Sequence, residues 1–369
     1  MFSKAEKLQQ TPVYQQSPIV TFSSNEIKVE MGSDSAKFLL IDSKPELISK
    51  EELDFKIFKI FDKEWHRKES GKRKPILIKN VDKRMKINLW SSNWFKLKFS
   101  GKNDINVDLI NCENGKEIPN ASMSFFWEGF DDTCKDVFFD EKSKVINTLK
   151  LKDWPTSNDF KVVLQDQYND LMENMPVNEY CHRYGIFNLA AKVPERFLKP
   201  DLGPKLYIAY SSQDSPQAGT TNLHIDISDA FNVLLYVGEK NLKKDKKKKE
   251  DATVSYFRKS GISEDQINRY LLGEKPGAIW HVFKPIDADK IRKAILDERS
   301  VKNRKGDPIH DQQTYLDDKL LNKLKTKFKV TPYTIFQFLG DAIFVPAGEP
   351  HQVIIQNGFK TASEYKPIM

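Results

Sequence analysis

The sequence has few cysteines and no long apolar segment. Only three of its 369 residues are cysteine, at positions 112, 134 and 181, and no two of them form a CxxC motif. Neither a disulfide framework nor a zinc finger is therefore supported. The first ten residues, MFSKAEKLQQ, lack the apolar stretch of a secretory signal, and no apolar run approaches the length that crosses a bilayer. These absences predict an intracellular protein without a membrane partner.

The composition is that of a globular protein with a small positive charge. Hydrophobic residues make up 39% and aromatic residues 11% of the chain, which is enough to bury a large core. Lysine and arginine total 59 against 52 aspartates and glutamates, which gives a net charge of +7. This excess is compatible with an acidic or nucleic-acid partner, but many ordinary soluble proteins share it.

Composition changes along the chain and suggests three parts. Residues 1–35 are rich in Gln, Ser and Thr with little periodicity, which is typical of a mobile leader. We expect residues 36–200 to form a helical and mixed N-terminal part of one functional unit. Residues 201–369 carry short aromatic and β-branched runs bounded by Gly, Pro, Asp or Asn, the pattern of an all-β barrel or sandwich. Within this last part, residues 239–330 are predicted to hold a helical, lysine-rich insert.

Apolar spacing predicts the individual elements. Four segments have helical spacing, one with a possible N-cap at Ser157 and one opened by a capping box of Ser263 and Gln266. These segments are residues 48–65, 157–175, 263–272 and 314–328. Strands are expected at residues 74–81, 205–210, 231–237, 277–283, 334–339, 342–346 and 351–355.

A lysine run lies between the expected strands. Residues 243–249 read KKDKKKK, six lysines in seven residues. Runs of like charge usually form solvated loops, and this is the first interpretation. The alternative is a contact to DNA phosphates or a nuclear localisation signal, which the basic residues GKRK at 71–74 would support. The two interpretations are compatible.

One pair among six histidines suggests a metal site. His224 and Asp226 are two residues apart in a segment with strand character, so that their side chains would point to one face. An HxD pair alone is weak evidence for a metal site, because it occurs often by chance. The segment GDAIFVPAGEPHQV at 340–353 strengthens it with a turn, a strand, a second turn and then His351. Two histidines and one carboxylate form the triad that binds Fe(II) and leaves open positions for other ligands. His281 and His310 have no spacing that suggests ligation and are expected to be structural.

Several segments in the same order resemble the jumonji C histone lysine demethylases. They are VDLINCENG (107–115), LKDWP (151–155), KPDLGPKLYIAY (199–210), GTTNLHIDISDAFNVLLYVG (219–238), KPGAIWHVF (275–283), DPIHDQ (307–312) and QFLGDAIFVPAGEPHQV (337–353). The subgroup that these segments resemble most includes the hairless protein and acts on mono- and dimethylated lysine nine of histone H3. The resemblance covers most of the chain, from about residue 75 to residue 365.

This resemblance implies a fold and a cofactor site. The family fold is mainly β with flanking helices, a double-stranded β-helix of the jelly-roll or cupin kind. The resemblance places Fe(II) on His224, Asp226 and His351, with O2 and 2-oxoglutarate as co-substrates. Thr221 is expected to hold 2-oxoglutarate, and Lys240 is the candidate counter-charge for its distal carboxylate, although it lies one position closer to Gly238 than the subgroup pattern.

Other residues have two readings under the same resemblance. Asn232 and Asn111 are weaker candidates for hydrogen bonds to 2-oxoglutarate, and ordinary polar residues at strand edges are an equal alternative. Tyr207 and Tyr210 could line a methyl-lysine channel, or they could be core tyrosines. Ile208 stands where the subgroup has a polar asparagine.

The implied reaction is removal of methyl groups from histone lysine, with release of formaldehyde and succinate. The implied partners are the histone H3 tail or chromatin, with DNA-phosphate contacts through residues 243–249, and the implied location is the nucleus. The zinc finger and the C-terminal segment of the subgroup have no counterpart in these residues. We therefore do not carry over the subgroup's substrate targeting and self-association, whereas the expected metal chemistry is unaffected. The alternatives are a protein or tRNA hydroxylase with the same metal centre and a catalytically silent chromatin-binding protein.

Overall fold

The fold is described from a computed structural model. It covers residues 29–31, 39–42, 50–66, 73–112, 114–131, 148–151, 153–194, 196–197, 203–210, 221–238, 254–255, 257–259, 262–274, 276–298, 306–355 and 358–361. Lys240 and the lysine run at 243–249 lie outside these residues, as does most of the expected leader. Val29–Met31, at the end of that leader, form a short strand that pairs with Leu39–Asp42.

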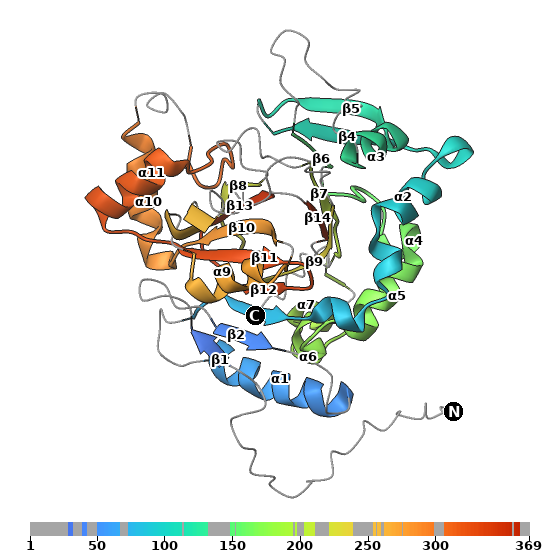
Figure 1. Ribbon diagram of the computed structural model, residues 1–369, viewed down its shortest axis with the longest axis horizontal. Coiled ribbons are helices and arrows are strands. Elements are labelled where there is room, and N and C mark those ends of the chain that lie inside the picture. Colours follow the sequence, from blue (N-terminus) through green and yellow to red (C-terminus); the bar gives the residue numbers. More distant parts are fainter. Residues whose placement is uncertain are drawn as a thin grey trace, which may run out of the picture.

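Two β-sheets form the centre of the molecule (Figure 1). The large sheet has the order β1-β2-β3-β12-β9-β14-β7. Its strands are β1 (Val29–Met31), β2 (Leu39–Asp42), β3 (Ile76–Lys79), β7 (Tyr207–Ile208), β9 (Ala230–Val237), β12 (Ala342–Val345) and β14 (Gly358–Thr361). The small sheet has the order β11-β10-β13-β8. Its strands are β8 (Thr221–His224), β10 (Pro276–Val282), β11 (Tyr333–Phe338) and β13 (His351–Ile355).

The inner faces of these two sheets pack against each other. Alternate residues of β9 and β12, such as Ala230 and Ile343, meet Trp280, Ile335 and Val353 from the small sheet in one buried apolar cluster. The period of two follows from strand geometry, since successive side chains point to opposite faces. The expected mainly β, double-stranded β-helix fold is confirmed, and this inner layer is where side chains from both sheets converge.

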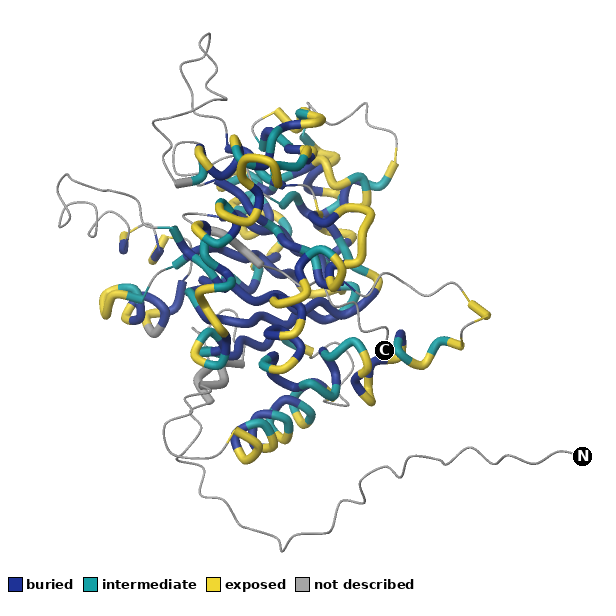
Figure 2. The backbone as a smooth tube through the Cα atoms, turned by 90° about the vertical axis from the view of Figure 1, so that its right-hand side faces the viewer, coloured by how far each residue is buried: buried dark blue, intermediate teal, exposed yellow. Residues whose placement is uncertain are grey.

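Helices cover the outer faces. The helices α1 to α7 pack with a third sheet, β5-β4-β6, around the outer face of the large sheet. Their bounds are α1 (Lys50–Trp65), α2 (Ser92–Lys98), α3 (Met123–Asp131), α4 (Phe160–Val163), α5 (Gln165–Asn174), α6 (Asn178–Cys181) and α7 (Leu189–Lys192), and those of the strands are β4 (Asn106–Asn111), β5 (Glu117–Ser122) and β6 (Leu149–Leu151). On the other side lie α9 (Glu264–Leu271), α10 (Ala288–Leu296) and α11 (Asp318–Lys323). Figure 2 shows the central strands as mainly buried and the exposed positions on peripheral helices and turns.

Two predicted helices differ from the structure in their boundaries. The segment 157–175 is not one helix but α4 and α5, because Leu164 between them has non-helical backbone angles, with φ −135° and ψ 60°. The N-cap is Asp159, whose side chain accepts from the backbone N–H of Lys161, so the assignment to Ser157 was wrong. The apolar stripe is nevertheless buried, as Phe160 and Leu171 show. In the segment 314–328, the helix begins only at Asp318 and continues as a π-helical turn, Leu324–Phe328.

The capping box before α9 is only half formed. The Ser263 hydroxyl accepts from the backbone N–H of Gln266, as predicted. The Gln266 side chain, however, donates to the backbone carbonyl of Phe336 and accepts from its N–H. Gln266 therefore joins α9 to strand β11 instead of closing the cap.

The expected strands of the C-terminal part are confirmed. The strands β7, β12 and β13 lie within the predicted ranges, and β9, β10 and β11 each begin one residue earlier than predicted. Strand β10 belongs to the small sheet, so the expected insert 239–330 is divided by an integral strand of the barrel. No helix in the described part of the chain is long and apolar enough to cross a bilayer.

His281 has the structural role expected of it. Its ring is 8% exposed on β10, and its Nδ1 lies 3.2 Å from Nε2 of Gln352. The Gln352 amide is itself oriented, because its oxygen accepts from the N–H of Leu316 and its nitrogen donates to the Leu316 carbonyl. The nitrogen of Gln352 is thus the donor to His281, and the imidazole must be neutral at Nδ1.

This burial predicts a pH dependence of stability. Burial lowers the pKa of His281 to about 4, from an ordinary value near 6.5. The folded state keeps the neutral ring, while the unfolded state takes up a proton below pH 6.5. The contribution of the buried His281 to the free energy of unfolding is therefore fully present above pH 6.5. It falls by about 3 kcal/mol as the pH drops toward 4. Urea unfolding should show that the free energy of unfolding falls less between pH 7 and pH 4 in His281→Leu than in the parent. His310→Gln, at an exposed site, should show the same pH dependence of this free energy as the parent. Equal slopes in all three proteins would contradict this assignment.

Candidate metal centre

Three side chains converge at the end of the small sheet. The Nε2 atoms of His224 and His351 lie 3.9 and 3.7 Å from Oδ2 of Asp226. His224 and His351 are direct neighbours in the pairing of β8 with β13, and their ring centroids are 4.1 Å apart. In the described residues, this is the one group of three or more His, Cys, Asp or Glu side chains whose ligand atoms come close enough to share a metal ion.

Both imidazoles are held in one tautomer by the backbone. Nδ1 of His224 lies 2.8 Å from the carbonyl oxygen of Asn222, and Nδ1 of His351 lies 2.9 Å from that of Glu349. A carbonyl oxygen can only accept, so each Nδ1 carries the proton. Each Nε2 therefore presents its lone pair toward Asp226, which is the arrangement of a metal-binding histidine oriented by an outer hydrogen bond.

Asp226 reaches the triad from a loop and not from a strand. Strand β8 ends at His224, so the predicted alternation of i and i+2 on one strand is not what brings the two side chains together. The carbonyl of Asp226 instead accepts from the N–H of Gly348, in the turn before His351. This contact fixes the loop that contains Asp226 to the turn that precedes His351. The three side chains lie together as predicted, but strand alternation is not the reason.

A bulge in β8 places Thr221 on the same face as His224. The pairs His351–His224 and Val353–Thr221 enclose two steps on β13 but three steps on β8. One extra residue in β8 thus shifts the alternation. Leu223 then packs outward among the residues near α10, while Thr221 lies opposite Val353 of the inner cluster. Thr221 and His224 therefore share the inner face despite their odd spacing.

Asn232 lies in the interior between the sheets. It is on β9 opposite Ile343, is 7% exposed, and its Oδ1 accepts from Nε2 of Gln337 at 3.1 Å. Gln337 in turn accepts from Nε1 of Trp280 at 2.8 Å. The Trp280 ring is stacked near that of His351, with 6.0 Å between centroids. Asn232 is thus linked to the triad through two buried side chains.

Four further residues that the resemblance singles out have the following surroundings. Asn111 ends β4 in the third sheet, where its Oδ1 accepts from the N–H of Asn114 in the following turn. Tyr210 is 3% exposed and donates its hydroxyl to the Phe126 carbonyl, so it packs in the core around α3. Ile208 is also buried in that cluster. Tyr207 is partly exposed on β7.

Two buried carboxyl groups, Asp229 and Glu349, lie in the loops around the triad. Asp229 accepts from the N–H of Ala347 at 2.6 Å, and Arg73 lies 3.9 Å from it. Burial raises the pKa of Asp229. Burial also raises the pKa of Glu349, and the nearby charge of Asp229 adds to this rise. The turn that precedes His351 is thus hydrogen-bonded to Asp229, directly before the start of β9.

Gln337, Trp280 and Glu349 were missed from the sequence. They belong to no ligand motif, and their role depends on contacts between strands that are distant in the chain. The sequence did contain an indication for Gln337. Strand β11 is otherwise almost apolar, and a polar residue in a buried strand needs hydrogen-bond partners.

The triad fits a divalent metal ion with open positions. Two neutral imidazole nitrogens and one carboxylate oxygen form a donor set that suits Fe(II). Oδ2 of Asp226 is buried and has no hydrogen-bond partner among the described residues. A buried carboxylate oxygen is rarely left without a partner, and a bound cation would supply one.

Comparison with known proteins agrees with this site. Residues 267–362 match the family model of the JmjC domain, which is described as a hydroxylase. The chain is 40% identical to lysine-specific demethylase 3A of Rattus norvegicus over 286 residues, 76% of this chain and 23% of that protein. It is 42% identical to lysine-specific demethylase 3 of Drosophila melanogaster over 79% of this chain and 34% of that protein. It is 39% identical to the probable JmjC domain-containing histone demethylation protein 2C of Homo sapiens over 76% of this chain and 11% of that protein.

The chain thus spans about a third or less of the length of these relatives. The similarity covers His224 and Asp226 only in these longer alignments, because the family match begins after them. Taken with the two-sheet fold and the triad, the matches show that this chain carries a JmjC domain.

Proposed function

We propose that the protein is an iron(II)- and 2-oxoglutarate-dependent dioxygenase that demethylates histone lysine. The observation that carries this proposal is the oriented triad, two Nε2 atoms and one carboxylate oxygen at the edge of the inner layer. The names of the relatives, which are lysine-specific demethylases, support the choice of reaction. We propose mono- and dimethylated lysine nine of histone H3 as the substrate, as in the subgroup that includes hairless.

The residues of the chain have separate tasks in this reaction. His224, Asp226 and His351 would hold Fe(II), which supplies the oxidising chemistry once O2 and 2-oxoglutarate have bound. The carbonyls of Asn222 and Glu349 keep both imidazoles oriented. Trp280 and the apolar inner cluster exclude water from the layer behind the metal.

We propose that 2-oxoglutarate binds along the inner face next to the triad. Thr221 and Asn232 are the proposed hydrogen-bond donors, and Lys240 is the proposed counter-charge. Asn111 remains a weaker candidate. The position of Thr221, on the same inner face as His224, supports its part in this set. Chromatin as the partner, DNA-phosphate contacts through residues 243–249 and a nuclear location complete the proposal.

The reaction is tested by measuring two products together. Purified protein with Fe(II) and 2-oxoglutarate should release equal amounts of succinate and formaldehyde from mono- and dimethylated histone H3 peptides. Trimethylated peptides should react more slowly. Decarboxylation depends on the metal centre alone, whereas formaldehyde requires a methyl-lysine at that centre.

The pattern of products separates the alternatives. Succinate with a stable hydroxylated product, and no formaldehyde, would assign the chain to the hydroxylases. Absence of both products in protein with verified iron would indicate a silent chromatin-binding protein. The same panel on nucleosomes reports whether DNA contacts matter.

A further inference from the structure

Gln337 is a polar side chain in the layer between the two sheets. It is fully buried on β11 and shares its face with Tyr333 and Ile335, which belong to the inner cluster. Its amide contacts Trp280 on the neighbouring strand β10 and Asn232 on β9 of the opposite sheet. Gln337 is thus a polar connection from one sheet to the other.

The direction of the hydrogen bonds through Gln337 is determined. The indole N–H of Trp280 can only donate, so the Gln337 oxygen must face it, at 2.8 Å. The Gln337 nitrogen then faces two backbone carbonyls, those of Asp341 at 3.0 Å and Asn232 at 3.3 Å. A carbonyl can only accept, so both ends of the amide require the same orientation.

This direction passes on to the Asn232 side chain. Nε2 of Gln337 has two hydrogens for three acceptors, so one hydrogen is shared between the backbone carbonyl and Oδ1 of Asn232, and at 3.1 Å the Asn232 side chain must present its oxygen on that side. Its Nδ2 is then directed elsewhere and makes no hydrogen bond within the described parts of the chain. Asn232 therefore offers an N–H donor in the interior, where an amide in the other orientation would offer an acceptor.

We propose that Gln337 is a positioning residue, which fixes the relay from Trp280 through Gln337 to Asn232 and so presents the Asn232 N–H to a carboxylate of 2-oxoglutarate. This rests on the proposed co-substrate site at Asn232. A carboxylate can only accept, so the orientation of the amide decides between attraction and repulsion. The relay begins at the Trp280 ring, which is stacked near His351.

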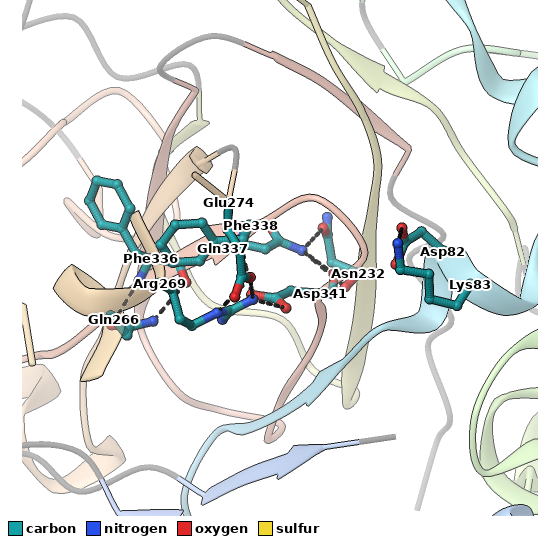
Figure 3. Close-up of polar contacts among 10 residues, drawn as sticks. All are labelled: Asp82, Lys83, Asn232, Gln266, Arg269, Glu274, Phe336, Gln337, Phe338 and Asp341. Atoms are coloured by element: carbon teal, nitrogen blue, oxygen red, sulfur yellow. Dashed lines mark hydrogen bonds and ion pairs between the residues drawn. The ribbon is translucent and has the colours of Figure 1, made fainter. Parts of the chain in front are cut away.

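The far side of Gln337 is held by an ion pair. The Asp341 carbonyl that receives Gln337 belongs to the turn between β11 and β12, and the Asp341 carboxylate binds both terminal nitrogens of Arg269 at 2.8 Å (Figure 3). The same carboxylate accepts from the N–H of Phe338. Helix α9 thus keeps the turn, and with it the amide of Gln337, in place.

The test compares substitutions on the two faces of strand β11, at Gln337 on the inner face and at Gln266, which contacts the outer face. Gln337→Met removes the relay and Gln337→Glu reverses it, because the new carboxylate would draw the Asn232 N–H toward itself. Gln266→Met is the matched control, since Gln266 is buried and binds the same strand from its outer face at Phe336. The measured quantity is the Kd of 2-oxoglutarate for the Fe(II)-loaded protein without O2, by calorimetry, with the Kd of Fe(II) beside it.

We expect Kd for 2-oxoglutarate to rise about tenfold in Gln337→Met, as for the loss of one charge-assisted hydrogen bond, and further in Gln337→Glu. Fe(II) affinity should stay unchanged, and Gln266→Met should bind 2-oxoglutarate like the parent. In an Asn232→Ala background the Gln337 substitutions should have no further effect on Kd. If the Gln337 variants fold poorly, Trp280→Phe removes one of the groups that fix the orientation of the Gln337 amide and should raise the Kd of 2-oxoglutarate by a smaller factor.

A second readout does not depend on the co-substrate. With nitrogen-15 in the tryptophans, the indole N–H signal of Trp280 should be protected from exchange in the parent and in Gln266→Met, and should lose protection in Gln337→Met. Parental binding with unchanged Kd in both Gln337 variants would overturn the relay and leave the dioxygenase proposal standing. Failure of the parent itself to bind 2-oxoglutarate would remove the proposed function and the role of Gln337 with it.

Discussion

Replacing His224 or Asp226 with alanine is expected to abolish turnover and to weaken Fe(II) binding by more than about a hundredfold. Each residue is one of the three proposed metal ligands, whose ligand atoms all lie within 4.8 Å of one another. The fold should be largely retained, because Asp226 is in a loop and His224 ends an edge strand. Metal content after dialysis and succinate release in the presence of 2-oxoglutarate measure both effects.

The control for this experiment is His310→Ala. His310 is exposed and lies outside the triad. It should keep parental iron content and parental activity. Turnover retained in His224→Ala or Asp226→Ala would refute the assignment of the metal centre, even if some iron remained bound to the protein.

The second large effect concerns stability. Arg269→Met should lower the free energy of unfolding by about 3–5 kcal/mol, because it leaves the Asp341 carboxylate buried without its counter-charge. Asp341 is fully buried and Arg269 is 6% exposed. Burial alone would lower the pKa of Arg269, but the charge and hydrogen bonds of Asp341 outweigh this and raise it. Arg269 also lies over the Phe338 ring, 4.2 Å from its centroid, so a methionine of similar length keeps part of the packing.

Urea denaturation measures this change, and two variants test its cause. Arg258→Met removes an arginine with equally good geometry to Glu264, but both side chains are exposed, so the change in stability should be small. Arg269→Met combined with Asp341→Asn should be less destabilised than Arg269→Met alone, because no unpaired charge is then buried. Equal loss in the Arg258 and Arg269 variants would contradict the ion-pair explanation.

The strands and the three side chains of the triad could be predicted from the sequence because both depend on local patterns. FNVLLYV and GAIWHVF are short runs rich in aromatic and β-branched residues, which is the composition of a buried strand. The HxD pair and the later histidine belong to a motif of fixed residue types, so their identity did not require the correct backbone. The reason given for His224 and Asp226 failed, since the strand ends between them.

Other features could not be predicted because they arise from contacts that are distant in sequence. The bulge in β8 depends on the pairing of β8 with β13. In this pairing His224 lies opposite His351, which is 127 residues further along the chain. The side chain of Gln266 could have closed its cap, but the free backbone groups of Phe336 compete for it. The break at Leu164 interrupts a stripe that is apolar throughout, so spacing alone gave no sign of it.

The bulge in β8 has a consequence for which length changes this chain tolerates. Edge strands normally accept an inserted or deleted residue more easily than central ones, since only one neighbour must adjust. Here the deletion of Asn222 or Leu223 would restore regular alternation and turn either Thr221 or His224 toward the side of α10. The length of β8 is thus constrained by the proposed metal site and not by the sheet. Among natural variants of this chain, we expect substitutions at position 222 and no change in the number of residues between Thr221 and His224.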